Sequence, residues 1–393
     1  MAIAAKIREA MERSSWVRKM FEIGTAMKQE FGADNVYDFS IGNPDAPPPA
    51  VFQRVLEEAV SLREPNKHGY MPNAGYPEVR RRVAEYLSAE QGVQVSPQGV
   101  IMTCGAGGGL NVALKTILNP GDRILVSTPY FVEYGFYVDN HGGVLEAVPC
   151  GEEFDLDLNA LEARMDARTA GVIINSPNNP SGKIYSAETI RNLAALLERK
   201  SRELGRTIYL LSDEPYRKIA FDGITVPEVF SSYRNSILVT SYSKDLSLPG
   251  ERIGWLAIHP QADDFADLVN GAILCNRILG FVNAPGLMQR VVGELQGQSV
   301  DISQYQRKRD RLCETLGPMG WEFLKPQGTF YLFPRAPGGD DLKTVEVLRE
   351  EKILAVPGRG FGLPGYFRLS FCVDDRVIEG SLPAFQRALD RLR

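Results

Sequence analysis

The segment that decides the fold reads ILVTSYSKDLSLPGERIGW and runs from residue 237 to residue 255. Its start, 237–241, is an apolar run that predicts a strand covered on both faces of a sheet. Lys244 follows that strand at its carboxyl end, where open α/β sheets bind their ligands. Burial beside the cation of Arg252 would lower the pKa of the lysine amine and make it a nucleophile toward carbonyl carbons. Most lysines in loops are surface residues, so a role for Lys244 needs support from other motifs.

Six further short apolar runs predict strands of the same sheet. They alternate with helical patterns, which indicates an α/β fold with a mostly parallel, seven-stranded sheet flanked by helices. Two helices are well marked by apolar stripes, one directly after Gly105 and one over 187–204. The predicted strands cover residues 100–103, 123–127, 144–148, 171–175, 207–212, 237–241 and 253–258.

The last third of the chain has a different pattern and predicts a smaller α+β domain. Amphipathic helices near 301–316 and 342–351 alternate with short strands in FYLFP, ILAVP and YFRLSF, and a last helix follows them. We expect an N-terminal arm with part of the small domain, a large domain that binds the cofactor, and a small C-terminal domain. These parts are expected at residues 1–47, 48–283 and 284–393.

Composition limits the possible function classes. The 393 residues carry a formal net charge of −5 and a pI of about 5.5, which argues against a nucleic-acid partner. No apolar run reaches the ~18 residues of a membrane span, and the N-terminus shows no secretory signal pattern. The five cysteines are odd in number and widely spaced, so we expect reduced thiols in a cytoplasmic protein. No cysteine or histidine pair has metal-site spacing, and we expect no metal.

Two more motifs place polar residues at the same predicted sheet edge. In LLSDEPY, Asp213 ends a buried strand and Tyr216 comes three residues later. In NSPNNPSG, Asn179 follows a strand that ends at Asn175. Taken alone, such an aspartate usually caps a helix and such asparagines usually form a turn. About 30 residues separate Asp213 from Lys244, the length of one strand–crossover–strand unit, so we expect the two side chains to be neighbours.

The remaining signals concern anions and a flat ring. The glycines of TCGAGGG, 103–109, start a helix whose free backbone amides could bind a phosphate. Phe131 could stack on a ring, although an aromatic residue at such a place more often belongs to the core. Arg368 lies inside an alternating strand, where its guanidinium needs a carboxylate from protein or ligand. Three side chains could complete the phosphate shell: Ser241, Ser243 and Arg252. In combination the motifs fit pyridoxal phosphate carrying an amino acid.

With these motifs the chain resembles the fold type I pyridoxal-phosphate aminotransferases of class I/II, the group that includes the aspartate aminotransferases. The resemblance runs from residue 37 to residue 374, with the motifs in the family's order. They are DFSIGNPD, GYMPNAGYPEVR, TCGAGGG, TPYFVEYG, NSPNNPSG, SDEPY, SYSKDLSLPGERIGW, QGTFYLFP and FRLSF. The resemblance implies transfer of an amino group between an L-amino acid and a 2-oxo acid by a ping-pong mechanism, with 2-oxoglutarate or pyruvate as acceptor.

The resemblance also implies roles around the cofactor. Lys244 would carry pyridoxal phosphate as a Schiff base, and Asp213 would pair with its pyridine nitrogen. Tyr216 and Asn179 would hydrogen-bond the phenolic oxygen of the ring, and Phe131 would stack on the ring. The phosphate would be held by Gly105, Ala106, Gly107, Ser241, Ser243 and Arg252.

Substrate and partner follow from the same resemblance. Arg368 would bind the substrate α-carboxylate, helped by Asn179 and by the backbone at Gly42. Tyr70 matches the tyrosine that reaches the phosphate of the neighbouring subunit, which implies a homodimer with sites at the interface.

One departure from the family pattern bears on the substrate. Some aspartate-specific relatives carry a lysine at the position that Gly107 occupies here, so a neutral, aliphatic or aromatic donor is favoured. A carbon–sulfur β-lyase on the same fold is the alternative, because the cofactor motifs do not discriminate between the two reactions. A non-catalytic sensor and a dinucleotide-dependent oxidoreductase are weaker, the latter because Leu110 stands where its fingerprint requires glycine.

Overall fold

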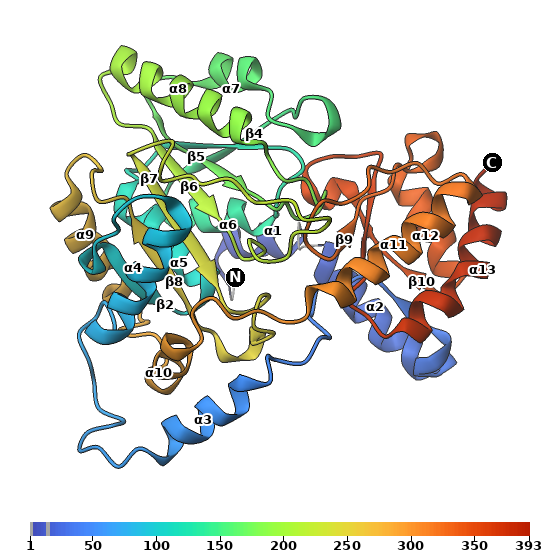
Figure 1. Ribbon diagram of the computed structural model, residues 1–393. Helices are drawn as coiled ribbons and strands as arrows, with labels where there is room; N and C mark the ends of the chain where they lie inside the picture. Colours follow the sequence, from blue (N-terminus) through green and yellow to red (C-terminus); the bar gives the residue numbers. More distant parts are fainter. Residues whose placement is uncertain (1–2, 13–15) are drawn as a thin grey trace.

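A seven-stranded sheet forms the centre of the larger part of the molecule (Figure 1). The computed structural model describes residues 3–12 and 16–393. The strand order is β2-β8-β7-β6-β5-β3-β4, in which β8 runs antiparallel to both neighbours and the other pairs are parallel. The strands are β2 Val100–Thr103, β3 Arg123–Ser127, β4 Val144–Val148, β5 Thr169–Asn175, β6 Tyr209–Asp213, β7 Ser236–Ser241 and β8 Gly254–Ile258.

The register of this sheet brings polar strand ends together. Asn175 at the end of β5 pairs with Asp213 at the end of β6, and Asp213 pairs with Val239 of β7. Because parallel strands finish at one edge, the loops that follow them share that edge. Along each strand the side chains alternate between the two faces, so Leu210 and Leu211 belong to different core clusters.

Helices cover both faces of the sheet (Figure 1). One face packs against α5, α6 and α9, and the other against α3, α4, α7, α8 and α10. Their bounds are α3 Val51–Ser61, α4 Pro77–Gln91, α5 Gly105–Ile117, α6 Glu133–Asp139, α7 Leu158–Arg164, α8 Ala187–Leu204, α9 Phe265–Ile278 and α10 Gly286–Glu294. A sheet covered on both faces explains why its strands are apolar runs rather than alternating patterns.

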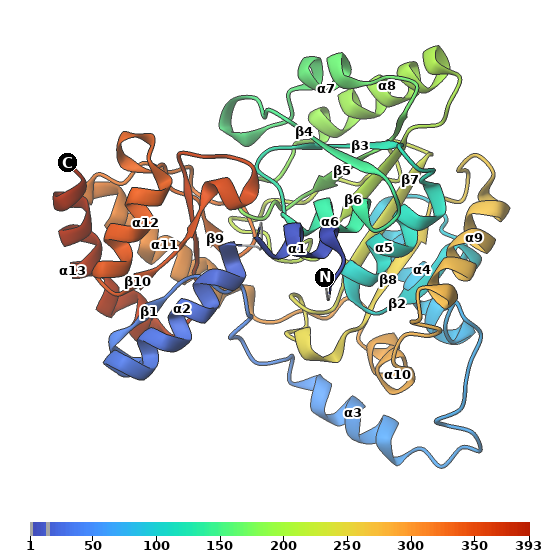
Figure 2. The ribbon, with the colours of Figure 1, turned by 180° about the vertical axis from the view of Figure 1, so that it is seen from behind.

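The smaller part combines short strands with helices and lies beside the sheet (Figure 2). Strands β9, β11 and β12 form an antiparallel sheet, and β1 pairs with β10 in parallel. The N-terminal segment therefore joins this part through β1. The elements are α2 Trp16–Phe31, β1 Tyr37–Asp38, α11 Ile302–Met319, β9 Tyr331–Leu332, α12 Asp341–Glu350, β10 Ile353–Leu354, β11 Val356–Pro357, β12 Phe367–Ser370 and α13 Asp375–Leu392.

The structure confirms the predicted α/β architecture, and each of the seven predicted strands is present. Their ends differ from the prediction by up to two residues, as at β5, which begins at Thr169 rather than at residue 171. Apolar periodicity marks which residues are buried but not where the last ladder hydrogen bond forms, which accounts for these shifts.

The packing of the core suggests a different boundary between the two domains from the one expected at residue 284. Helix α10 lies after residue 283, yet its residues Val291 and Val292 belong to the core cluster of the large sheet. Val300 and Tyr305 belong instead to the core of the smaller part. We propose that the small C-terminal domain begins close to Val300, and that residues 284–295 belong with the large domain.

Three further observations concern expectations from composition. Within residues 3–12 and 16–393, no helix is long and apolar enough to cross a membrane. The same described residues contain no group of three or more side chains that could hold a metal ion. All five cysteines are free thiols.

A close backbone contact fixes the start of α5 on the sheet. Gly254 of β8 lies against Gly105, and a Cβ atom added at residue 254 would lie 3.1 Å from the Cα of Gly105 and overlap the carbonyl oxygen of Thr240. Only glycine therefore allows β8 and the start of α5 to approach this closely.

We expect Gly254→Ala to lower the free energy of unfolding by about 2–3 kcal/mol, because the added methyl group must displace backbone atoms. Urea denaturation of the variant and the parent measures the difference. Gly250→Ala is the matched control, since nothing lies within 4 Å of a Cβ atom there. Equal losses of stability in the two variants would contradict the assigned contact.

Candidate active site

A cavity of about 380 Å³ opens at the carboxyl edge of the sheet. Its walls come from the loops after the parallel strands, from the starts of α5 and α6, and from the smaller part of the molecule. Twelve of the fourteen residues predicted for the site line this cavity: Gly42, Ala106, Gly107, Phe131, Asn179, Asp213, Tyr216, Ser241, Ser243, Lys244, Arg252 and Arg368. Gly105 lies immediately before the cavity wall at the first residue of α5, and Tyr70 lines a different pocket.

Lys244 projects from the loop after β7 into this cavity. Its Nζ donates a hydrogen bond to the carbonyl oxygen of Gly42 at 2.8 Å. Burial lowers the pKa of the Lys244 amine from its ordinary value of 10.5 to about 8, and the positive charges of Arg368 and Arg252 act in the same direction. With a pKa of about 8, roughly a tenth of the amine is neutral and nucleophilic at pH 7, far more than at the ordinary value.

Asp213 is a buried carboxylate with one free oxygen. Its Oδ2 accepts a hydrogen bond from the hydroxyl of Tyr134 at 2.6 Å, whereas its Oδ1 is buried without a partner in the described part of the chain. Burial raises the pKa of Asp213 from 3.8 to about 7, and the hydrogen bond from Tyr134 opposes that rise. A buried acceptor without a donor is costly, so Oδ1 calls for an N–H group on a ligand.

Arg368 of β12 is buried, with only 2% of its surface exposed. It has no carboxylate partner among the described residues. Its guanidinium lies between the rings of Tyr331 and Phe361, 4.5 and 4.7 Å from their centroids. It donates hydrogen bonds to Oδ1 of Asn179 at 3.1 Å and to the carbonyl oxygen of Ser40 at 2.8 Å, while its Nε has no partner. A buried guanidinium held only by neutral acceptors is a site for a ligand carboxylate.

The start of α5 and the side chain of Arg252 face the same end of the cavity. Gly105 has φ +72°, and a Cβ atom there would lie 3.0 Å from the guanidinium of Arg252. The first amides of a helix have no acceptor within the helix and attract anions. The hydroxyl-bearing residues Ser241 and Ser243 are buried and line the cavity nearby. This arrangement suits a phosphate group.

These groups fit pyridoxal phosphate. The cofactor has a phosphate for the start of α5, a ring nitrogen for the free oxygen of Asp213, and an aldehyde for Lys244. An amino acid joined to it brings a carboxylate for Arg368. Each of these protein groups lacks an ionic partner of its own in the described structure.

Sequence reasoning missed several residues of the site. Tyr134 holds Asp213, and Tyr331 hydrogen-bonds the hydroxyl of Tyr216 at 3.0 Å and covers one face of Arg368. Both lie inside motifs that the sequence displays, TPYFVEYG and QGTFYLFP. Each motif contains several aromatic residues, and the sequence does not show which of them reaches the site. A tyrosine in a motif rich in apolar residues usually belongs to the core.

Behind the cavity, buried charges hold the loop that carries Asp213 and Tyr216. Arg217 pairs with Glu214 at 3.1 Å and with Glu90 at 2.9 Å. Lys218 pairs at 3.4 Å with Asp245, the residue after Lys244. Within residues 213–218, Asp213 and Tyr216 thus line the cavity, whereas Glu214, Arg217 and Lys218 form ion pairs behind it. The pair of Lys218 with Asp245 joins this loop to the loop of Lys244.

The lowered pKa of Lys244 predicts a pH-dependent effect on the protein without cofactor. Below pH 8 the parent must bury a charged amine, which costs about 3 kcal/mol for a pKa lowered from 10.5 to about 8. Lys244→Met cannot be charged, so it should be about 2–3 kcal/mol more stable than the parent at pH 7. The stability gain of the variant should shrink as the pH rises from 8 and be gone by about pH 10.5. In that range the folded parent has already lost the proton that its unfolded chain still binds. Denaturation across pH measures it, and a variant less stable than the parent at pH 7 would refute it.

Comparisons with known proteins agree with this geometry. The sequence profile of the family "Aminotransferase class I and II" matches residues 34–383. A probable aspartate/prephenate aminotransferase of Aquifex aeolicus is 31% identical over 386 residues, which cover 94% of this chain and 95% of the relative. A probable aspartate aminotransferase of Methanocaldococcus jannaschii is 29% identical over 378 residues, with coverage of 94% and 96%.

Solved structures extend the likeness to the whole fold. An amino transferase from Eubacterium rectale is 40% identical, covers 100% of both chains and superposes with a TM-score of 0.97. The aspartate aminotransferase of Thermus thermophilus with maleate is 25% identical, covers 99% of this chain and 100% of its own, and has a TM-score of 0.87. With profile, relatives and site in agreement, this chain belongs to the class I and II aminotransferases, fold type I enzymes that depend on pyridoxal phosphate and exchange amino groups between amino acids and 2-oxo acids.

Proposed function

We propose that this aminotransferase takes its amino group from an L-amino acid without a second carboxylate and passes it to a 2-oxo acid, to pyruvate in preference to 2-oxoglutarate because the same lining receives both donor and acceptor. The observation that supports the proposal is that the described lining has three lysine or arginine residues, and each already has a role in binding or in the reaction. Arg368 suits the α-carboxylate and Arg252 suits the phosphate. Lys244 is the remaining lysine or arginine of the lining, and its amine is required for the reaction. No cation is left in the described lining for a distal carboxylate.

When bound, pyridoxal phosphate supplies an aldehyde that condenses with amines and a ring that accepts the electron pair left by the α-proton. Asp213 would keep the ring nitrogen protonated through its free Oδ1, and Tyr134 holds the carboxylate in place from the other oxygen. Phe131 lies edge-to-face with Tyr134, with centroids 5.6 Å apart, and would cover one face of the ring.

The residues around the substrate orient it and move its proton. Arg368 would grip the α-carboxylate and so align the α-C–H bond for cleavage, with Asn179 beside it. The Nζ of Lys244, when free of the cofactor, would accept the α-proton of the substrate and later donate it, first as base and then as acid. Tyr216 and Asn179 would hydrogen-bond the phenolic oxygen of the cofactor, while Gly105, Ala106 and Gly107 would offer backbone amides to its phosphate.

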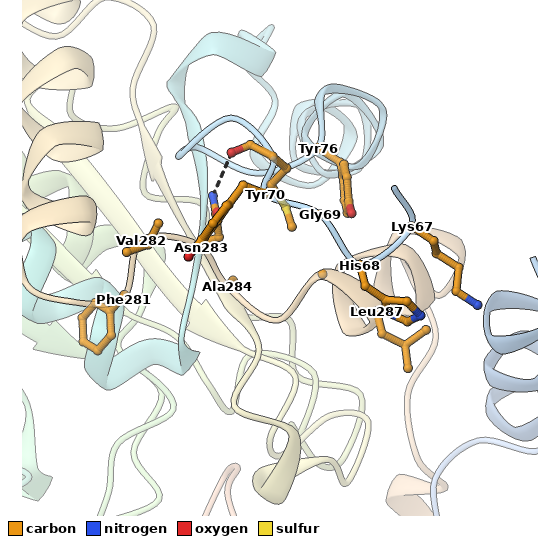
Figure 3. A pocket seen from close by; sticks show the side chains of 12 residues that line it. Lys67, His68, Gly69, Tyr70, Tyr76, Phe281, Val282, Asn283, Ala284 and Leu287 are labelled. Carbon is orange, nitrogen blue, oxygen red and sulfur yellow. Dashed lines mark hydrogen bonds between the residues drawn. The ribbon is translucent and has the colours of Figure 1, made fainter. Parts of the chain in front are cut away.

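Tyr70 supports a homodimer. Its side chain is 94% exposed and lines a second pocket of about 420 Å³ between residues 67–71 and 281–287 (Figure 3). Leu274 and Ile278, on the last turns of α9, are also exposed. An exposed tyrosine and exposed apolar side chains suit burial by a second copy, and Tyr70 would then reach the phosphate of that copy's site. We further propose a cytoplasmic location, which the five free thiols support.

The proposed reaction is tested with the enzyme loaded with pyridoxal phosphate. A neutral amino acid should abolish the visible absorbance of the cofactor bound to Lys244, and a 2-oxo acid should restore it. Lys244→Ala should lower kcat by at least about 10⁴-fold, since it removes both nucleophile and proton carrier. Release of pyruvate and ammonia from a cysteine conjugate without any 2-oxo acid would favour the β-lyase instead. Multiple turnovers of Lys244→Ala at the parent rate would refute the assigned role.

Subunit mixing tests the role of Tyr70. Tyr70→Ala and Lys244→Ala should each be poorly active, because each damages every site of its own homodimer. A heterodimer of the two would have one site with an intact lysine from one subunit and an intact tyrosine from the other. Random reassociation should therefore restore about a quarter of the parent activity at limiting cofactor. If both residues served the same subunit's site, mixing would restore nothing.

A further inference from the structure

Five charged residues line the described part of the catalytic cavity, and one of them has no role in the reaction as proposed. Asp213, Lys244, Arg252 and Arg368 serve the cofactor or the α-carboxylate. The fifth is Glu133, the first residue of α6. A carboxylate in the wall of a substrate cavity must influence which side chains can enter it.

Glu133 is half-buried and unpaired. No hydrogen bond or ion pair to its carboxylate is found within residues 3–12 and 16–393. Burial raises the pKa of Glu133 above its ordinary value, so removal from water is the main influence on this group. Its position in the first turn of α6 offsets part of that cost, because the positive end of the helix dipole stabilises an anion there. The side chain is therefore free to meet a ligand.

The neighbours of Glu133 locate it within the cavity. Tyr137 lies one helical turn further along α6 and lines the same cavity, and its pKa is raised to about 12, first by burial and next by the negative charge of Glu133. The Tyr137 hydroxyl is 2.9 Å from the place that a Cβ atom on Gly107 would occupy. The Tyr137 hydroxyl thus occupies the space that a side chain at residue 107 would need, which places the wall of Glu133 and Tyr137 next to the start of α5.

We propose that Glu133 selects amino donors whose side chains end in N–H groups, ammonium or amide, and rejects donors that carry a second carboxylate. The proposal rests on the proposed function, since it assigns Arg368 to the α-carboxylate and Lys244 to the reaction. A terminal ammonium or amide would donate a hydrogen bond to the Glu133 carboxylate, with the Tyr137 hydroxyl beside it. A terminal carboxylate would meet an unpaired like charge in a partly desolvated wall, where repulsion is strong.

Four donors of matched length test the selection: ornithine, glutamine, norvaline and glutamate. Their half-reactions are followed by the absorbance of the cofactor in the loaded enzyme, which gives kcat and KM for each. In the parent, ornithine and glutamine should exceed glutamate in kcat/KM by at least about tenfold. In the reverse direction, pyruvate should be preferred to 2-oxoglutarate for the same reason.

Glu133→Gln removes the charge and keeps the shape. It should lower the ratio of ornithine to glutamate by about tenfold, chiefly through KM, and leave norvaline unchanged. Glu251→Gln is the control, because it removes an exposed carboxylate next to Arg252 that does not line the cavity. Its donor ratios should equal those of the parent. A thermal unfolding curve for each variant checks that folding is intact.

The outcomes separate the selection from the reaction. If none of the four donors, norvaline included, undergoes a half-reaction, the proposed function fails. If norvaline reacts but glutamate equals ornithine, or Glu133→Gln leaves their ratio at the parent value, the proposal for Glu133 is overturned and the reaction stands.

Discussion

The structure depends most on two buried charged groups that have no ionic partner within the described protein. Asp213 holds a carboxylate away from water with one oxygen unpartnered, and Arg368 holds a guanidinium without a carboxylate. Unpaired buried charges cost several kcal/mol each in a folded protein, so a fold that keeps them must be stabilised elsewhere. A ligand that carries the opposite charges at both places regains that free energy on binding. These two groups therefore explain why the cavity suits a protonated ring nitrogen and an α-carboxylate together.

The stabilising contacts lie directly behind the same loops. Glu214 and Arg217 form a buried pair next to Asp213, and Lys218 reaches Asp245 next to Lys244. The Lys218–Asp245 pair joins the loop of Asp213 to the loop of Lys244, and both functional side chains line one cavity. The Nζ of Lys244 donates its hydrogen bond to the carbonyl oxygen of Gly42 rather than to Asp213. Neither group neutralises the other by a hydrogen bond in the described residues, and the proposed cofactor would contact both.

The sequence predicts the sheet well and the site only in outline. Strands buried on both faces appear as plain apolar runs, and the residues at their carboxyl ends, such as Asp213 and Asn179, follow from topology. Tyr331 could not be found in this way, because its place beside Arg368 depends on the pairing of β9 with β12 in the smaller part, where Tyr331 lies opposite Ser370. The proposed shift of the domain boundary from residue 284 to near Val300 likewise depends on packing. The apolar spacing of helix α10 would suit a helix of either domain. Its contacts with α3 and α4 are what place it with the large domain.

Helix α6 shows how one short element serves two purposes at once. Tyr134 points into the core cluster and fixes Asp213, so a change there would disturb the electrostatics of the cofactor. Glu133, the residue before it, bonds nothing in the described structure and faces the cavity. Since successive residues of a helix point about 100° apart, Tyr134 reaches Asp213 while Glu133 lines a different part of the same cavity wall. Side-chain selectivity can therefore vary at Glu133 while the machinery that all donors share stays fixed.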